Sequence, residues 1–366
     1  MNLYRIFDRN RIFLIFLGIM ISAAPGERVR HPVDPVGFAT QSWQMDSVMN
    51  RIFRISEQRI SAAWDRNKID KFTSWKVVIC PHDDYTYAGW LYPTVLANIK
   101  APIVILIGVA HKAKKFGLED RMVFESFDQW SEPYGPVRVS FLREKIINQL
   151  PRSAFIIHDS IEQAEHSIEA IIPFLQYYNR KIEIIPILVP YMAFTTMDGL
   201  AGSLATAIKR VMQELDLKWN RDIAIVISND AVHYGDEDWG GQNYAPFGCD
   251  SAGYKKTLAH EYEIINNCLL GELNKSKIRR FTEYTIQDTN FRSYKWTWCG
   301  RYSVPFGLLT AYYLGQNLFS VPVHGDLLGY GNSIIQQLIP VDDLKMGKTA
   351  MASLHHWVGY AAIGYR

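Results

Sequence analysis

Three apolar runs of the sequence each lead into a polar cluster that contains a histidine. The runs cover residues 76–80, 102–108 and 222–228, and the histidines that follow them are His82, His111 and His233. Short, continuous apolar runs are typical of buried strands in a parallel sheet. Ligands of open α/β sheets bind outside the carboxyl ends of the strands. We therefore expect these histidines to meet at one edge of a sheet and to form an active or metal-binding site.

Asp230 and His233 lie three residues apart after the third run. At a strand-to-helix turn both side chains could face one pocket, with Asp230 as a metal ligand or as the group that fixes the tautomer of a histidine. His233 would then move protons. The alternative is that Asn229 or Asp230 caps the N-terminus of a helix and that His233 has no chemical role.

Cys299 is a further candidate ligand, because a thiolate binds metals strongly and the nearby Arg301 would help to keep it ionised. The alternative is a buried structural thiol. A sulfur together with two imidazoles and a carboxylate suits zinc, copper or iron, and the order of affinities alone does not choose among them. The four cysteines of the chain form neither a disulfide framework nor a Cys-x-x-Cys zinc motif.

The composition is that of a globular protein. The chain has 366 residues, 48% of them hydrophobic, and a formal net charge of +2, which gives no basic footprint for nucleic acid. Its partner is therefore expected to be a small-molecule ligand. We found no internal repeat and no linker, so residues 26–366 are expected to form one α/β domain.

The N-terminal residues resemble an export signal. Arginines at positions 5, 9 and 11 precede the apolar stretch 12–24, which is short for a membrane span. We expect residues 1–25 to be a signal peptide or an anchor, so that the protein is periplasmic or membrane-anchored and touches a membrane only through this segment. If translation starts at Met20, the apolar stretch is lost and the protein is cytoplasmic.

Hydrophobic periodicity predicts strands that alternate with helices over the body of the chain. The expected strands are residues 76–80, 102–108, 121–126, 137–139, 154–158, 181–189 and 222–228, with more between 318–330 and 350–364. The expected helices are residues 46–70, 90–99, 140–150, 161–178, 196–215, 255–270 and 304–314. This alternation predicts a central, mostly parallel sheet flanked by helices.

Five ordered motifs together resemble the Memo family, also called the AmmeMemoRadiSam system protein B group. They are Pro81-His82-x-x-Tyr85-x-Tyr87-x-Gly89, Gly108-x-x-His111, Glu165-His166-Ser167-Ile168-Glu169, Ser228-x-Asp230-x-x-His233-x-Gly235, and Cys299-Gly300-Arg301. We expect the third motif to open a helix, where the helix dipole would be a sufficient reason for Glu165.

The resemblance implies a fold similar to that of class III extradiol dioxygenases, which use non-haem Fe(II). By the same resemblance, His82, His111 and Cys299 would bind the metal, with Asp230 and His233 at the same site. A cysteine stands where those dioxygenases use a carboxylate. Asp83 and Asp84 stand where the family usually has Ala-Gly, and two extra acids would favour a hard cation. The group name also implies AMMECR1-like or radical-SAM partners encoded nearby.

Three functions are compatible with these residues. The first is a redox enzyme that uses Fe(II), or alternatively copper or zinc, on a small aromatic substrate, with His233, Asp230 and His166 as catalytic groups and with Tyr85, Tyr87 and Arg301 around the substrate. The second is a metal-binding or adaptor protein without turnover. The third is a zinc hydrolase with Asp83, Asp84 or Asp230 as its base.

Overall fold

The computed structural model describes residues 26–366 apart from positions 35, 319, 321 and 335–336. The expected signal peptide or anchor, residues 1–25, lies outside the described residues. Within the described part of the chain, none of the helices combines the length and the apolar character needed to span a bilayer.

Four parallel strands form the centre of a thirteen-stranded sheet. In spatial order they are β8 (Glu183–Val189), β3 (Ile103–Val109), β9 (Ile223–Ser228) and β2 (Val77–Cys80). The predicted α/β fold with a central, mostly parallel sheet in a single domain is therefore confirmed. The three apolar runs that precede the histidines are neighbouring strands, as predicted.

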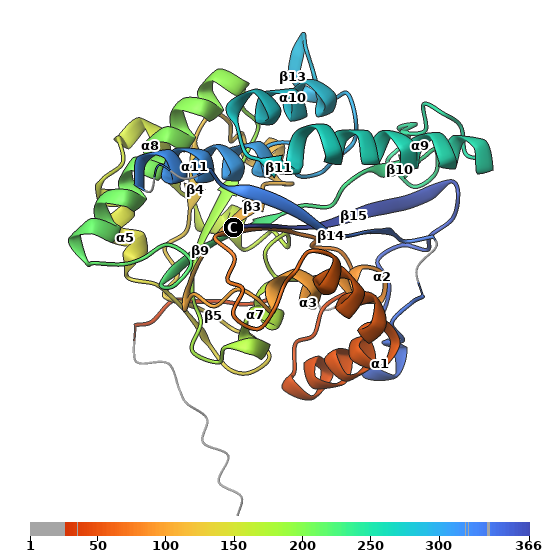
Figure 1. Cartoon of the computed structure of the whole chain (residues 1–366), viewed down its shortest axis with the longest axis horizontal. Helices are drawn as coiled ribbons and strands as arrows, with labels where there is room; N and C mark the ends of the chain where they lie inside the picture. The colour runs from red at the N-terminus through yellow and green to blue at the C-terminus, as the bar shows by residue number, and fades with distance from the viewer. Residues whose placement is uncertain (1–25, 35, 319, 321, 335–336) are drawn as a thin grey trace, which may run out of the picture.

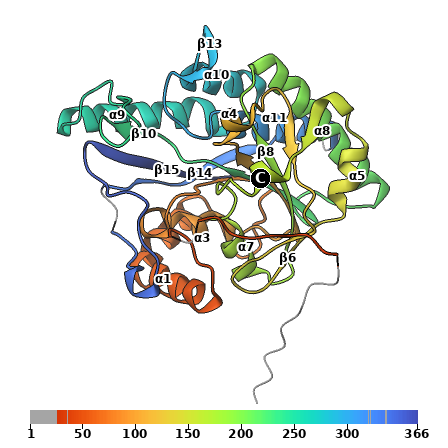
Figure 2. The same ribbon diagram turned by 180° about the vertical axis from the view of Figure 1, so that it is seen from behind.

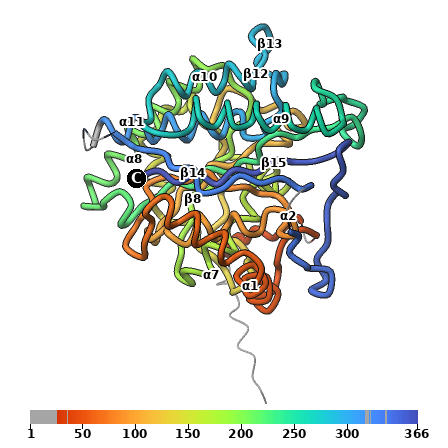
Figure 3. The backbone as a smooth tube through the Cα atoms, turned by 45° about the vertical axis from the view of Figure 1, so that its right-hand side comes forward, coloured from red at the N-terminus to blue at the C-terminus, as the bar shows by residue number. Residues whose placement is uncertain are grey.

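Shorter strands extend the sheet on both sides of these four. Beyond β2 the antiparallel strands β15 (His356–Tyr365), β14 (His324–Asn332) and β11 (Gly271–Glu272) follow in that order, and β14 and β15 run side by side through the middle of the molecule (Figure 3). Beyond β8 lie β6 (Val137–Val139), β5 (Gln129–Trp130) and β1 (Val29–Arg30). Off this path, β4 (Met122–Phe124) pairs with β7 (Phe155–Ile157) and β8, and β10 (His233–Gly235) pairs with β15. A separate hairpin consists of β12 (Ile286–Gln287) and β13 (Asn290–Tyr294).

Helices cover both faces of the sheet (Figures 1 and 2). One layer contains α5 (Leu142–Asn148), α8 (Phe194–Glu214), α9 (Ser251–Ile264), α10 (Lys275–Thr285) and α11 (Ser303–Leu318). The other contains α1 (Ser42–Arg66), α2 (Tyr85–Ala88), α3 (Leu91–Leu96) and α7 (Ile172–Tyr178). Two single-turn helices, α4 (Ala113–Phe116) and α6 (Asp159–Glu162), lie in connections.

The alternation of side chains along the central strands creates two hydrophobic cores. On β2, Val77 and Ile79 face the core under α8 and α11, whereas Val78 and Cys80 face the core under α1 and α3. Successive side chains of a strand point to opposite faces, so a strand covered on both faces must be apolar at every position. This requirement is the reason that the sequence shows continuous apolar runs there.

The predicted helix over residues 161–178, in which we expected a kink or an early end at Pro173, is wrong as a single element. The chain forms α6, then irregular turns over residues 163–171, and only then α7. Pro173 lies in the first turn of α7, where its missing N–H is tolerated. The Glu165 carboxylate accepts hydrogen bonds from the backbone N–H groups of His166 and Ser167. That contact replaces the helical hydrogen-bond pattern expected for this motif.

The expected strand-to-helix turn after β9 is also wrong, because the chain continues into strand β10 rather than a helix. Asp230 therefore caps no helix. Helix α10 and the β12–β13 hairpin were not predicted, and β14 and β15 begin later than expected, at His324 and His356.

A buried acid provides a test of this fold. Glu125 is fully buried and accepts hydrogen bonds from the indole N–H of Trp130 at 2.9 and 3.1 Å. Burial raises the pKa of Glu125 to about 8, despite those hydrogen bonds and the nearby Arg143. The folded state therefore holds a proton that the unfolded chain releases near pH 4.5, so this group destabilises the fold progressively from about pH 4.5 to pH 8.

We predict that Glu125→Gln, which keeps an acceptor for Trp130, raises the stability at pH 8 by roughly 2–5 kcal/mol and changes it little at pH 4.5. Chemical denaturation at the two pH values measures this difference. Glu144→Gln on α5, whose carboxylate is exposed, is the matched control. A Glu125→Gln protein that is equally destabilised at both pH values would contradict the prediction.

Candidate metal centre

The carboxyl ends of three neighbouring parallel strands bring the predicted residues together. His82 follows β2, Asp230 follows β9 and His111 follows β3, and these strands are adjacent in the order β3, β9, β2. The backbone N–H of His82 donates a hydrogen bond of 2.9 Å to Oδ1 of Asp230. Side chains that are distant in sequence therefore share one edge of the sheet.

Cys299 reaches the same edge through close contact with the segment after β9. Its backbone N–H donates to the carbonyl of Asp230 at 3.2 Å, and the N–H of Gly300 donates to Oδ1 of Asn229 at 3.2 Å. A side chain at position 300 would place its Cβ 2.2 Å from that same oxygen, so glycine is required for this approach. The Sγ atom of Cys299 lies 3.3 Å from Nε2 of His82.

Ser228 fixes the tautomer of His82. The Ser228 hydroxyl donates to the carbonyl of Ser167, so it can only accept a hydrogen bond from Nδ1 of His82, which lies 2.7 Å away. The proton of the neutral ring is therefore on Nδ1, and Nε2 carries the lone pair. Nε2 faces Sγ of Cys299 and, at 3.4 Å, Oδ2 of Asp230. A metal-ligating histidine usually has this arrangement.

Glu165 plays the same part for His111. Its Oε1 atom lies 2.7 Å from Nδ1 of His111, which leaves Nε2 of that ring free. Burial opposes ionisation of Glu165, but the charge of a protonated His111 and the hydrogen bonds from His111 and from the N–H of His166 lower its pKa to about 2. Glu165 is thus a carboxylate at neutral pH, and it can accept the hydrogen bond from Nδ1 of His111.

Two overlapping sets of three donors have ligand atoms within 4.8 Å of one another. One set is His82, His111 and His166, and the other is His82, Asp230 and Cys299. His82 belongs to both sets, and the ring of His166 stacks on that of His111 with centroids 4.9 Å apart. The imidazoles, carboxylate and thiol present here are donors that iron, copper and zinc accept in proteins.

His233 belongs to neither of the two sets. Its Nε2 atom is buried and has no hydrogen-bond partner among the described residues, and its ring lies 5.3 Å from that of Trp239. Burial, followed by the nearby His111 and His356, lowers the pKa of His233 to about 3, so the ring is neutral at physiological pH. The structure therefore places His233 beside the donor sets, with an Nε2 atom that has no partner among the described residues.

A cavity of about 270 Å³ opens directly onto these side chains. His82, His111, His166, Asp230 and His233 line one side of it. The aromatic rings of Phe38, Tyr87, Trp239, His356 and Tyr360 line much of the rest. A volume of this size suits a small molecule, and its mixture of apolar walls with a few convergent polar groups is typical of ligand sites.

The family model for Memo-like proteins matches residues 52–334 of the chain, which include all five motifs and His82, His111, His166, His233 and Cys299 of this site. The chain belongs to the Memo-like family.

Several MEMO1 family proteins are similar to this Memo-like chain. The protein of Aquifex aeolicus is 32% identical over 163 residues, which cover 43% of this chain and 54% of that protein. The protein of Pyrobaculum arsenaticum is 28% identical over 162 residues, 43% of this chain and 52% of the relative. A match to the protein of Pyrococcus furiosus is 25% identical over 265 residues and covers 70% and 79% of the two chains. The chain spans about half the length of the first two relatives.

In this Memo-like protein, two of the predicted ligands, His82 and Cys299, are uncharged at neutral pH. Burial lowers the pKa of His82 well below its usual value, with the three neighbouring histidines adding to the effect. Burial and then Asp230 raise the pKa of the Cys299 thiol well above its usual value. Arg301 acts in the expected direction and lowers the pKa of Cys299, but its effect is smaller than these two. A metal must displace a proton from Cys299, so binding should strengthen as the pH rises.

Tyr85 and Arg301 do not line the cavity, although both were predicted near the substrate. Tyr85 is fully buried in the core, and its hydroxyl donates to the carbonyl of Ala170. The Arg301 guanidinium lies over the Tyr294 ring, 3.4 Å from its centroid, and faces a different cavity. Tyr87 lines the cavity, as predicted.

Asp83 and Asp84, the two additional acids, form hydrogen bonds with residues of the cavity wall. Asp83 accepts a hydrogen bond of 2.5 Å from the Tyr360 hydroxyl, and Asp84 accepts hydrogen bonds from the backbone N–H and the hydroxyl of Thr349. Burial, and then the charge of Asp83, raises the pKa of Asp84 to about 7. Neither acid belongs to a donor set among the described residues, so the argument that they favour a hard cation is not supported.

Sequence reasoning missed the residues that support the ligands. Ser228 stood in a quoted motif but had no role assigned, and Glu165 was attributed to a helix dipole. The stacked rings of Trp239 and His356, 4.0 Å apart, were also missed. A hydroxyl at the last position of a buried apolar strand was the available signal for Ser228.

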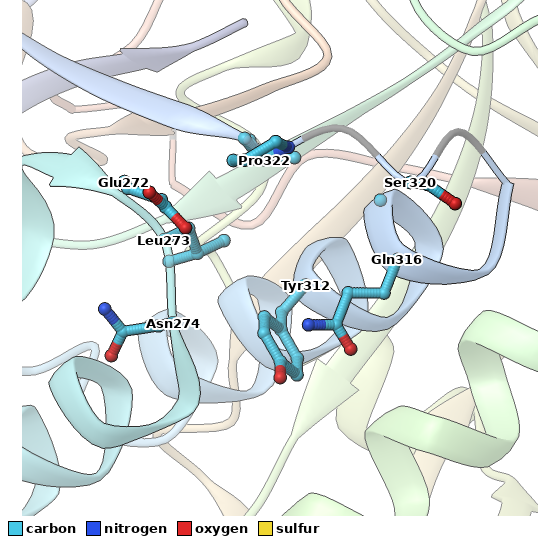
Figure 4. Close-up of a pocket in the computed structure, with 9 residues that line it drawn as sticks. Glu272, Leu273, Asn274, Tyr312, Gln316, Ser320 and Pro322 are labelled. Carbon is cyan, nitrogen blue, oxygen red and sulfur yellow. The ribbon is translucent and has the colours of Figure 1, made fainter.

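A larger cavity of about 470 Å³ lies between α11 and the start of α10 (Figure 4). Tyr312 and Gln316 of α11 border it on one side, and Glu272 and Asn274 border it on the other. The described residues that line it include neither histidine nor cysteine. The described residues around it therefore offer fewer metal-binding groups than those around the smaller cavity.

We predict that Ser228→Ala and Glu165→Ala each weaken the binding of Fe(II) or Zn(II) by roughly 10–100-fold, because each change frees a ligating imidazole to adopt the wrong tautomer. Anaerobic competition with a chromophoric chelator measures the affinity. Ser140→Ala, which removes an equally buried hydroxyl elsewhere, is the matched control. Affinities equal to that of the control would show that Ser228 and Glu165 do not orient the ligands.

Proposed function

We propose that this chain is a metal-dependent enzyme that carries out redox chemistry on a small aromatic molecule, with Fe(II) as its metal. The observation that carries the proposal is the pair of fixed tautomers of His82 and His111, whose ligand atoms lie within 4.8 Å of each other, with Sγ of Cys299 3.3 Å from Nε2 of His82. His82 and His111 both line a cavity with aromatic walls. Similarity of the family to extradiol dioxygenases is part of the same proposal.

By family resemblance His82, His111 and Cys299 would hold the ion. The ligand atom of His82 lies within 4.8 Å of those of His111 and His166 in one set, and of those of Asp230 and Cys299 in the other. When bound, Fe(II) would supply one-electron chemistry and open coordination positions. The chain itself contributes the orientation of the rings through Ser228 and Glu165. Cys299 and His82 are only 2% and 3% exposed, so bulk water has little access to these donors.

The walls of the cavity would bind the substrate ring. Trp239 and His356 form one stacked surface, and Phe38 and Tyr87 provide further apolar contact. His233 lies along the same wall with a free Nε2 atom, so it can accept a hydrogen bond or a proton from a substrate hydroxyl. His166, whose pKa burial lowers to about 4 with His111 adding to the effect, is the second group that could accept one.

A metal-binding role without turnover is the second candidate. It is favoured by Cys299, because a thiolate beside an oxygen-activating metal is itself easily oxidised. The structure gives less support to a zinc hydrolase. Asp83 and Asp84 are engaged by Tyr360 and Thr349, and burial, followed by Asp83, raises the pKa of Asp230 well above its usual value, so none is a free base.

The test is oxygen uptake by protein loaded with Fe(II) under anaerobic conditions, measured with a panel of phenols and catechols that fit about 270 Å³. We predict substrate-stimulated uptake that falls at least about 100-fold in His233→Ala while bound iron is unchanged, since general acid–base groups contribute about 10²–10⁴-fold. His260→Ala, a partly exposed histidine on α9, is the control.

The other possible results of this test distinguish the alternative functions. Unchanged turnover in His233→Ala would remove that residue from the mechanism. Tight, reversible metal binding without uptake across the panel would overturn the enzyme proposal in favour of metal binding. Hydrolysis that persists without oxygen in zinc-loaded protein would point to the hydrolase instead.

A further inference from the structure

A second group of metal-type donors lies outside the sheet-edge site. Asp236 directly follows β10, Cys249 precedes α9, and His355 directly precedes β15. The Oδ1 atom of Asp236 lies 3.1 Å from Sγ of Cys249 and 2.7 Å from Nδ1 of His355, and the three ligand atoms lie within 4.8 Å of one another. β10 and β15 are paired strands below α9 in Figure 1.

The backbone holds these segments together. The N–H groups of Asp236 and Glu237 both donate to the carbonyl of His355, at 3.0 and 3.1 Å. Gly235 has a φ of +134°, and a Cβ there would lie 1.8 Å from the same carbonyl oxygen, so only glycine permits the approach. Backbone contacts thus position Asp236 and His355 independently of the hydrogen bonds that their side chains make.

The third donor is fixed through Tyr234. Its hydroxyl donates to the carbonyl of Gly248 and accepts a hydrogen bond from the N–H of Phe247, both at 3.1 Å. Tyr234 is a buried residue of β10, so these two bonds tie the segment that carries Cys249 to the strand that carries Asp236. The donors therefore come together because three separate chain segments are anchored to one another.

The chemistry of the donors selects the kind of ion. A thiol, an imidazole and a carboxylate in one place are ligands of zinc and of the neighbouring divalent transition metals, whereas calcium and magnesium sites use oxygen alone. The carboxylate of Glu237 lies 3.9 Å from Nδ1 of His355, outside the group of three donors. The side chains of His355 and Asp236 are 48% and 39% exposed, so an ion can enter from solvent.

We propose that Asp236, Cys249 and His355 form a second, outer binding site for a divalent transition metal of the zinc class. The ion binds the Cys249 thiolate, and the thiol proton passes to solvent. In the metal-free protein, burial and the adjacent Asp236 raise the pKa of Cys249 to about 11, so the thiol stays protonated until the ion arrives. The proposal does not depend on the proposed enzymatic activity.

The outer site would stabilise one wall of the cavity. His356, next to His355, stacks on Trp239, and its Nδ1 atom lies 3.1 Å from the carbonyl oxygen of Glu237. An ion that joins Asp236, Cys249 and His355 would hold in place the two segments from which His356 and Trp239 project.

The test is anaerobic titration of the full chain with Co(II), whose thiolate complexes absorb in the near ultraviolet. Cys299→Ser removes the inner thiolate, so any remaining cobalt–thiolate band reports another cysteine. We expect this band, with about one equivalent of tightly bound metal, in Cys299→Ser and in Cys299→Ser/Cys268→Ser. Cys268 is a buried thiol that belongs to neither site and serves as the matched control. The band should be absent in Cys299→Ser/Cys249→Ser.

A second measurement leaves Cys299 in place and follows the reactivity of Cys249. Zinc should slow the alkylation of Cys249 in the wild-type protein, read by peptide mass spectrometry, by at least about tenfold, because a metal-bound thiolate is a poor nucleophile compared with the free one. Protection should be lost in His355→Ala and kept in His324→Ala, an exposed control histidine. Absence of the cobalt band in folded Cys299→Ser, or alkylation that zinc leaves unchanged, would overturn the outer site and leave the inner site untouched.

Discussion

The parallel pairing of β3, β9 and β2 is the constraint on which the site depends. Because both faces of these strands are covered by helices, their side chains must be apolar up to the last positions, where Cys80 pairs with Ser228. Polar residues can begin only where the strands end. In a parallel sheet those ends coincide, so His82, His111 and Asp230 lie together as a consequence of the packing. The antiparallel strands β15 and β10 then close the site from one side and carry His356 and His233.

Hydrogen bonds from outside the donor sets determine what the donors can do. Ser228 and Glu165 hold the protons of His82 and His111 on Nδ1, and both contacts pass through the irregular segment that contains Ser167. That segment is anchored by the Ser167 hydroxyl, which donates to the carbonyl of Val109 at the end of β3. The same strand therefore positions His111 and the group that orients it. Burial keeps the His82 imidazole neutral and the Cys299 thiol protonated, so neither of these two buried ligands carries an unpaired charge.

The local signals in the sequence were sufficient for the four central strands of the sheet and for the histidines that follow β2, β3 and β9. An apolar run bounded by polar residues reports burial on both faces, and this is the property that fixes β2, β3 and β9. The helix expected over residues 161–178 failed because its central turns are set by the Glu165 carboxylate and by contact with β3, which no periodicity records. Cys299 was connected to the site by family resemblance, since its contact with Asp230 joins residues 69 positions apart. The supporting Ser228 and the wall formed by Trp239 and His356 depend on tertiary contacts as well.

Metal content is the most direct test of the central claim, that His82 and Cys299 belong to one metal centre. The protein should be purified without oxygen as wild type, His82→Ala, Cys299→Ala and the control Cys268→Ala, and each should be analysed for iron, copper and zinc. We predict that His82→Ala and Cys299→Ala each lose about one equivalent of the same metal that wild type and Cys268→Ala retain. Undiminished metal in both variants, or no metal in the wild type even after reconstitution with Fe(II), would contradict it.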